Sequence, residues 1–152
     1  MKVLVIGGGG REHAIAAALA DGGAEVHAAM KNRNPGIAKL AKSVALVKET
    51  DVSAVLQAAQ VAGVEMAVCG PEAPLEVGLA DALEKAGIPC VGPSQAAARM
   101  ETSKSFAREL LRRHHISGNL DFAYFDTFEE CRRYVDGLDH DCLLYTSDAA
   151  DE

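Results

Sequence analysis

The sequence predicts an α/β fold, a doubly wound parallel sheet of five strands. Two observations predict it. Short apolar runs alternate with helical patterns over about the first ninety residues, and glycine directly follows several of these runs. Such alternation produces parallel strands joined by right-handed helical crossovers. A closed barrel needs about eight units of this kind, so we expect an open sheet with strand order 3-2-1-4-5.

Five short apolar segments are predicted as strands. Buried parallel strands consist of near-continuous apolar residues, often bounded by turn residues. The segments cover residues 2–6, 24–30, 43–47, 64–70 and 88–92.

Helices are predicted between these strands. The first covers residues 11–20, and a short one lies near 37–41. Thr50 is the expected N-cap of a third helix, in which apolar residues recur at helical spacing. A fourth helix carries Val77, Ala80 and Leu83 on one face, and Gly87 is placed to end it.

After residue 93 the alternating pattern changes. Residues 94–100 are predicted as a short helix, and Thr102 as the cap of a longer one. The segment 122–125 is expected to form a strand. Thr127 and Glu130 have capping-box spacing before a last helix. We therefore expect an α/β domain over 1–100 and the incomplete start of a second domain over 101–139.

The final segment, HDCLLYTSDAADE (140–152), shows no periodic pattern where a strand is expected. We interpret it as non-native sequence read through from a cloning or sequencing adapter. The alternative is a frayed, disordered acidic terminus.

Composition and charge exclude some classes of function. The net charge is −7, and ten of the 22 Asp and Glu residues lie in 121–152, so residues 1–120 are close to neutral. We find no basic stripe of the kind that nucleic-acid-binding proteins present. The alanine-rich stretch 14–20 is too short to span a bilayer, and no signal peptide is apparent. We expect a cytoplasmic protein with no nucleic-acid or membrane partner.

The four cysteines show neither a C-x-x-C pair nor metal-ligand spacing with histidine. Cys69 and Cys90 fall in apolar, strand-like segments, where we expect buried and reduced thiols. No metal ligand is therefore predicted in this chain.

The glycine loop Gly7–Gly10 follows the first predicted strand and precedes the first helix. Glycines allow a ligand to approach the backbone, and the free amides at a helix start favour an anion. In an open α/β sheet, ligands bind at the carboxyl ends of strands, where strand order reverses. We therefore expect this loop to face the GPEAP segment (70–74) across a crevice. The alternative is a tight turn without a ligand.

A dinucleotide is a weaker candidate for this loop. The G-x-G-x-x-G fingerprint places a third glycine where this chain has Glu12. It also expects an acidic residue after the second strand, where Lys31 and Arg33 stand instead. These two cations suit an NADP 2′-phosphate, so NADP stays an alternative.

Other candidate residues have two interpretations each. Arg11 is either a phosphate clamp or a solvated cation. Glu12 lies near a positive helix end, and it would suit sugar hydroxyls or an amine. His13 is more readily structural than catalytic. Glu72, between two prolines in a stiff loop, is interpreted as a ligand contact rather than an ordinary surface acid.

Four segments carry a resemblance to a known family. GGGGREHAIA (7–16), NPGIA (34–38), GPEAPL (70–75) and GIPCVGPS (87–94) occur in this order. With them, the chain resembles phosphoribosylamine–glycine ligase, or glycinamide ribonucleotide synthetase, from residue 1 to about residue 134. The KNRNPGIA loop is similar to the archaeal-type version of the family.

The resemblance implies an ATP-grasp ligase of purine biosynthesis, with a Rossmann-like pre-ATP-grasp domain over 1–100. ATP would phosphorylate the carboxylate of glycine, and the amine of 5-phosphoribosylamine would attack the acyl phosphate. ATP and Mg²⁺ or Mn²⁺ would be the cofactors, held by residues that this chain lacks. We therefore expect the chain to be inactive alone, and its oligomeric state is left open.

The resemblance also implies roles for particular residues. Lys104, in SKSFAREL (103–110), would contact the nucleotide at the beginning of the ATP-grasp region. Those placed around phosphoribosylamine would be Gly8, Gly9, Gly10, Arg11, Glu12, Pro71 and Glu72. The alternative functions are an NADP- or sugar-phosphate-binding module and another ATP-grasp carboxylate–amine ligase.

Overall fold

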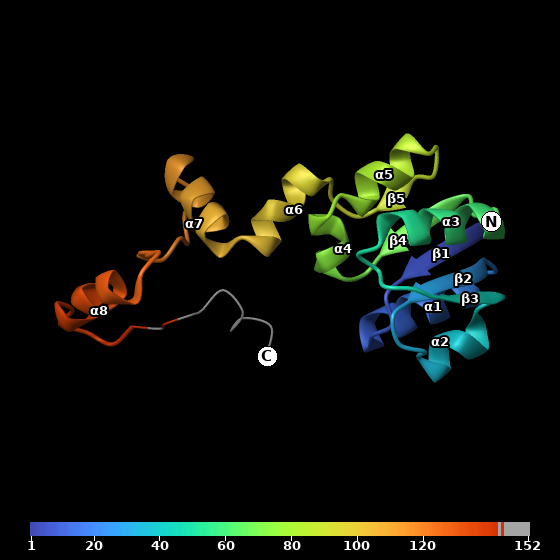
Figure 1. Ribbon diagram of the computed structural model, residues 1–152, viewed down its shortest axis with the longest axis horizontal. Helices are drawn as coiled ribbons and strands as arrows, with labels where there is room; N and C mark the ends of the chain where they lie inside the picture. Colours follow the sequence, from blue (N-terminus) through green and yellow to red (C-terminus); the bar gives the residue numbers. More distant parts are fainter. Residues whose placement is uncertain (143, 145–152) are drawn as a thin grey trace. The chain divides into compact units, whose positions relative to one another are not determined.

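The computed structural model describes residues 1–142 and 144 and contains a five-stranded parallel sheet (Figure 1). The strand order is β3-β2-β1-β4-β5, so the predicted fold class and strand order are confirmed. The strands are β1 (Lys2–Ile6), β2 (Glu25–Met30), β3 (Ser43–Leu46), β4 (Met66–Cys69) and β5 (Cys90–Val91).

Helices connect successive strands and continue after the sheet. In the first part of the chain they are α1 (Gly10–Asp21), α2 (Pro35–Leu40), α3 (Val52–Ala62), α4 (Glu72–Glu76) and α5 (Leu79–Lys85). Those after β5 are α6 (Gln95–Thr102), α7 (Lys104–Arg113) and α8 (Phe128–Asp136).

Helices cover both faces of the sheet, as a doubly wound fold requires (Figure 1). Side chains of β1 alternate between the two faces. Leu4 and Ile6 belong to the core that packs against α3 and α5, whereas Val5 belongs to the core beneath α1 and α2. Residues 3–6 of β1 are therefore buried on both sides of the sheet, which explains why they are all apolar.

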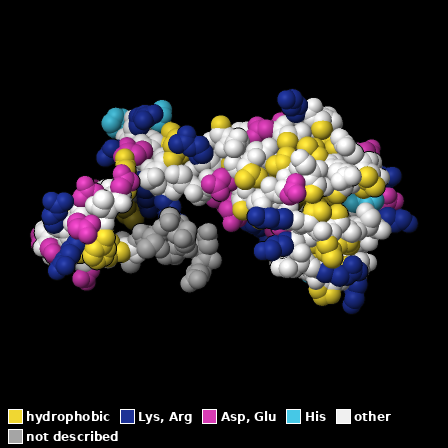
Figure 2. Space-filling model, viewed as in Figure 1, with side chains coloured by type: hydrophobic (Ala, Val, Ile, Leu, Met, Phe, Trp, Pro, Cys, Tyr) yellow, Lys and Arg dark blue, Asp and Glu magenta, His cyan; other side chains and the backbone are white. Residues whose placement is uncertain are grey.

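The chain divides into two compact units, Met1–Ala107 and a second that begins at Arg108. The sheet and its cores lie in the first unit. The predicted boundary near residue 100 and the assignment of 101–139 to a second domain stay predictions. On the face that Figure 2 shows, acidic and basic side chains are interspersed over the first unit. Among the described residues, no helix is both long and apolar enough to cross a membrane.

Two predicted N-caps are wrong by one residue. Asp51, not Thr50, caps α3, because its carboxylate accepts a hydrogen bond from Ala54 N at 3.0 Å. Thr102 is the last residue of α6, and the Ser103 hydroxyl accepts from Phe106 N at 3.3 Å at the start of α7. In both places a neighbouring residue has a side chain that serves equally well as a cap. The Thr127 cap of α8 is confirmed.

Three other predictions need correction. Residues 122–125 form no strand, since a strand needs a neighbour for its backbone groups and the regular structure described in this unit is helical. The GPEAP segment is only partly a loop, because Glu72 begins α4. Proline is well tolerated in the first turn of a helix, so the two prolines do not prevent it. The helix predicted around Val77 begins only at Leu79, after Gly78 in the left-handed region.

Candidate functional site

The glycine loop after β1 and the segment after β4 lie in contact, as their strand positions predict. The two strands are neighbours with parallel pairing, so both segments leave the same edge of the sheet. Gly70 N donates to Ile6 O at 3.1 Å. A Cβ on Gly7 would lie 2.8 Å from Pro71 Cδ. Gly7 also has φ of 111°, which favours glycine.

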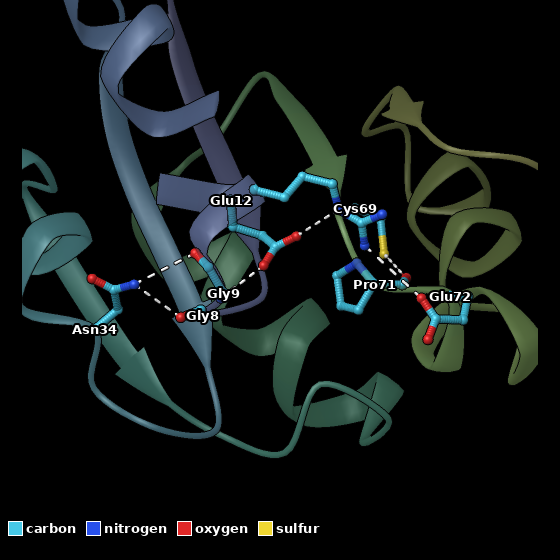
Figure 3. A network of polar contacts seen from close by, with 8 residues as sticks. Gly8, Gly9, Glu12, Asn34, Cys69, Pro71 and Glu72 are labelled. Atoms are coloured by element: carbon cyan, nitrogen blue, oxygen red, sulfur yellow. Dashed lines mark hydrogen bonds and ion pairs between the residues drawn. The ribbon is translucent and has the colours of Figure 1, made fainter. Parts of the chain in front are cut away.

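Glu12 lies at the centre of this contact (Figure 3). Its side chain is 6 % exposed and accepts a hydrogen bond from Gly9 N at 2.7 Å, which closes a capping box at the start of α1. The second carboxylate oxygen accepts from Arg11 Nε at 3.0 Å. Glu12 is therefore a buried side chain with one hydrogen bond to each carboxylate oxygen, not a surface acid.

Three glycines make room for the Glu12 side chain. A Cβ on Gly70 would overlap its carboxylate, and one on Gly9 would lie 2.6 Å from Oε2. A Cβ on Gly7 would lie 2.8 Å from Glu12 Cγ. The carboxylate thus occupies part of the expected crevice. Glu12 also occupies the sequence position at which the dinucleotide fingerprint requires glycine, which weighs against a dinucleotide ligand here.

Arg11 connects α1 with α4. Its NH2 group lies 3.9 Å from Glu72 Oε2, and its side chain is more than half exposed. The hydrogen bond from Arg11 to Glu12 raises the pKa of the guanidinium, and the charge of Glu72 adds to this effect. Arg11 is always protonated at ordinary pH, so two carboxylates hold a permanent cation at the edge of the site.

Three backbone amides of this segment are free to bind an anion. Among the hydrogen bonds of the described residues, none is donated by the amides of Gly8, Gly10 or Arg11. Unpaired N–H groups at a helix start, together with the helix dipole, attract negative charge. The arrangement therefore offers amide donors beside a carboxylate–guanidinium pair, which suits a ligand with a phosphate and with hydroxyl or amine groups.

Asn34 is a site residue that sequence reasoning missed. Its Nδ2 donates to Gly8 O at 2.9 Å and lies 3.4 Å from Gly9 O (Figure 3). Its Oδ1 accepts from Gly36 N and Ile37 N, which caps α2. The N-cap role was readable from Asn before Pro-Gly. The contact with a loop 26 residues earlier had no signal in the sequence.

The buried thiol of Cys69 lies next to the same loops. Its Sγ is 3.5 Å from Pro71 O, and burial raises the pKa of the thiol to about 12. Burial also raises the pKa of Cys90, which is half-buried. Neither thiol forms a disulfide. The predicted burial is confirmed for Cys69 and is only partial for Cys90, and the reduced state stays a prediction. Neither has the lowered pKa of a nucleophile.

Other candidates lie elsewhere. Lys104 begins α7 and is exposed; within the described part of the chain it has no hydrogen bond or ion pair to the residues above. The ring of His13 packs against Gly36 on α2, which fits a structural role. A shallow groove of about 430 Å³, lined by residues of α4 and α6 including Glu76 and Arg99, was not predicted.

Comparison with known proteins identifies the family of this chain. The sequence profile described as phosphoribosylglycinamide synthetase, N domain, matches residues 1–101. A phosphoribosylamine–glycine ligase of Pyrococcus horikoshii is 52% identical over 136 residues, which is 90% of this chain and 31% of that protein. The chain therefore spans about a third of the length of the curated relatives that it matches.

Solved structures share the fold at low sequence identity. Phosphoribosylglycinamide synthetase from Anaerococcus prevotii is 19% identical with a TM-score of 0.62, over 90% of this chain and 34% of that one. The biotin carboxylase domain of a single-chain bacterial carboxylase is 24% identical with a TM-score of 0.70, over 89% and 33%. These likenesses support the architecture, and the sequence matches identify the family. The chain belongs to the phosphoribosylglycinamide synthetase family and contains its N domain.

Proposed function

We propose that this chain is the substrate-binding amino-terminal part of a phosphoribosylamine–glycine ligase and that its glycine loop binds 5-phosphoribosylamine. The observation that carries the proposal is the meeting of the glycine loop and the Pro71–Glu72 segment around Glu12. The family match supports the choice of ligand over the alternatives.

The geometry favours one orientation of the substrate. The free amides of Gly8, Gly10 and Arg11 would receive the 5-phosphate, because they are unpaired donors at a helix start. Glu12 and Glu72 would lie toward the sugar hydroxyls and the amine, since carboxylates accept hydrogen bonds from both. Pro71 would act through its contact with Gly7, which fixes the two loops together.

The ligation itself would need ATP and a divalent metal, Mg²⁺ or Mn²⁺, to activate the glycine carboxylate. In the part of the chain that the structure describes, no cluster of three or more His, Cys, Asp or Glu residues could hold a metal ion. The described residues therefore do not fit a divalent metal ion. Lys104 stays our only candidate for a nucleotide contact, and we propose that the chain alone forms no glycinamide ribonucleotide. The predicted cytoplasmic location likewise stays a prediction.

Titration of the 152-residue chain with ribose 5-phosphate, followed by NMR or calorimetry, tests the proposal. We expect saturable binding that shifts the amide signals of Gly8, Gly9 and Gly10. NADP is the matched competitor. Binding of NADP without any response to ribose 5-phosphate would support the dinucleotide alternative and overturn the proposal.

Two matched variants sharpen this experiment. Glu12→Gln removes the negative charge beside Arg11 and keeps an acceptor for Gly9 N. We expect it to weaken ribose 5-phosphate binding about tenfold, since a charged hydrogen bond contributes about 1.5–3 kcal/mol. Glu65→Gln makes the same chemical change just before β4, at the opposite edge of the sheet. If both variants weaken ribose 5-phosphate binding equally, the ligand does not bind at Glu12.

A further inference from the structure

The loop between β2 and α2 packs closely against the glycine loop. A Cβ on Gly8 would lie 3.0 Å from Asn32 O and 3.3 Å from Met30 Cβ, so the two loops lie too close together for a side chain at Gly8 without a shift. Within this contact the carboxamide of Asn34 faces both Gly8 and Gly9 (Figure 3). The anion site of α1 is therefore supported from a second strand end, that of β2.

The Asn34 carboxamide joins two segments through its two ends. Oδ1 accepts from Gly36 N at 2.9 Å and Ile37 N at 3.2 Å, which fixes the side chain at the start of α2. Nδ2 then points at the carbonyl oxygens of Gly8 and Gly9. Only a side chain with an acceptor and a donor on one planar group makes both sets of contacts.

These contacts, together with the hydrogen bond from His13 N to Gly9 O at 3.0 Å, hold the two peptide units that follow Gly8 and Gly9. A trans peptide unit is planar, with its C=O and N–H on opposite sides. When the carbonyls of Gly8 and Gly9 face Asn34, the N–H groups of Gly9 and Gly10 face away from it. The Gly9 amide then meets Glu12, and the Gly10 amide is left without a protein partner among the described residues.

We propose that Asn34 is a positioning residue for the phosphate-binding glycine loop, through the peptide units that follow Gly8 and Gly9. This inference rests on the proposed function, because it assumes that the loop binds the substrate phosphate. Asn34 acts through the peptide planes and touches no substrate. Its loss releases the carbonyl of Gly8 to turn toward the ligand, where an oxygen would repel a phosphate, whereas the Gly9 carbonyl keeps its hydrogen bond from His13 N.

Asn34→Asp is the main test. Aspartate caps a helix as well as asparagine does, so α2 is retained, but the oxygen that replaces Nδ2 cannot donate and repels the two carbonyls. The matched control is Asn32→Asp, which adds the same charge in the same loop at an exposed side chain without hydrogen bonds among the described residues. Asn34→Ser also caps the helix, is too short to reach Gly8 and adds no charge.

The readouts are the dissociation constant for ribose 5-phosphate and the melting temperature of the 152-residue chain. We expect Asn34→Asp and Asn34→Ser to weaken binding tenfold or more, and Asn32→Asp less than threefold. Melting temperatures should stay within a few degrees of that of the unmodified chain. Amide hydrogen exchange should become faster at Gly9 in the two Asn34 variants only.

Two results would overturn the inference, and they are distinguishable. If the unmodified chain does not bind ribose 5-phosphate, the proposed function fails together with the inference. If it binds, and Asn34→Ser binds equally well or Asn32→Asp weakens binding as much as Asn34→Asp, only the positioning role fails.

Discussion

The two units of this chain differ in what their helices can bury. In the first unit, helices lie on a parallel sheet that is apolar on both faces, and side chains such as Val5 and Leu79 are fully buried. In the second, α8 has a good N-cap at Thr127, yet none of its residues is buried. Every buried side chain of the described residues lies between Val3 and Ala98.

The difference shows that local signals are sufficient to form a helix but not to build a core. The second unit has aromatic contacts, such as Phe125 with Tyr134 at 5.2 Å between ring centroids, and a cation–π contact of Arg112 with Phe122. These are surface contacts worth about 0.5–1.5 kcal/mol each. Most of the stability of this chain should therefore come from the first unit.

The largest expected effect comes from one substitution made in each unit. Leu79→Ala removes a fully buried side chain from the core beneath α5, whereas Leu120→Ala removes one that is 69 % exposed. We expect Leu79→Ala to lower the free energy of unfolding by about 2–5 kcal/mol and Leu120→Ala to change it by about 0.5 kcal/mol or less. Urea denaturation measures both. If the two variants lose similar amounts of unfolding free energy, the two units do not differ in their contribution to stability.

A smaller effect is expected at the site within the first unit. Gly70→Ala places a methyl group against the Glu12 carboxylate, and we expect it to lower the free energy of unfolding by about 1–3 kcal/mol. Gly10→Ala is the control, because a Cβ there meets nothing within 4 Å. At this helical position, alanine should stabilise the chain by about 0.4–1 kcal/mol. If Gly70→Ala leaves the free energy of unfolding unchanged, the Glu12 side chain can move away from Gly70 at little cost.

The smallest effect concerns thiol chemistry and should leave stability unchanged. Because burial raises the pKa of Cys69 to about 12, little thiolate exists at pH 8, and iodoacetamide should label it far more slowly than the exposed Cys142. The rate at Cys69 should continue to rise with pH toward 12, since the thiolate fraction grows over that range. Mass spectrometry of labelled peptides gives both rates. Rapid labelling of Cys69 at pH 8 would mean that β4 opens readily.

Much of the fold and part of the site could be predicted from the sequence. The strand order followed from the alternation of apolar runs and helices, because crossover handedness leaves few topologies. The meeting of the glycine loop with the segment around Pro71 followed from that order. The strand predicted at 122–125 was wrong, since its composition suits a strand but the described residues of the second unit include no strand to pair with it.

The sequence by itself thus determined the sheet, its two buried faces and the edge at which the glycine loop lies, because periodicity and turn residues act over a few positions. Only the tertiary structure decided how the loop is held. Glu12 is buried because Gly70 comes within reach from a different strand end, and Asn34 holds Gly8 across 26 residues. Such contacts depend on where strands place distant residues in space, and no local pattern encodes them.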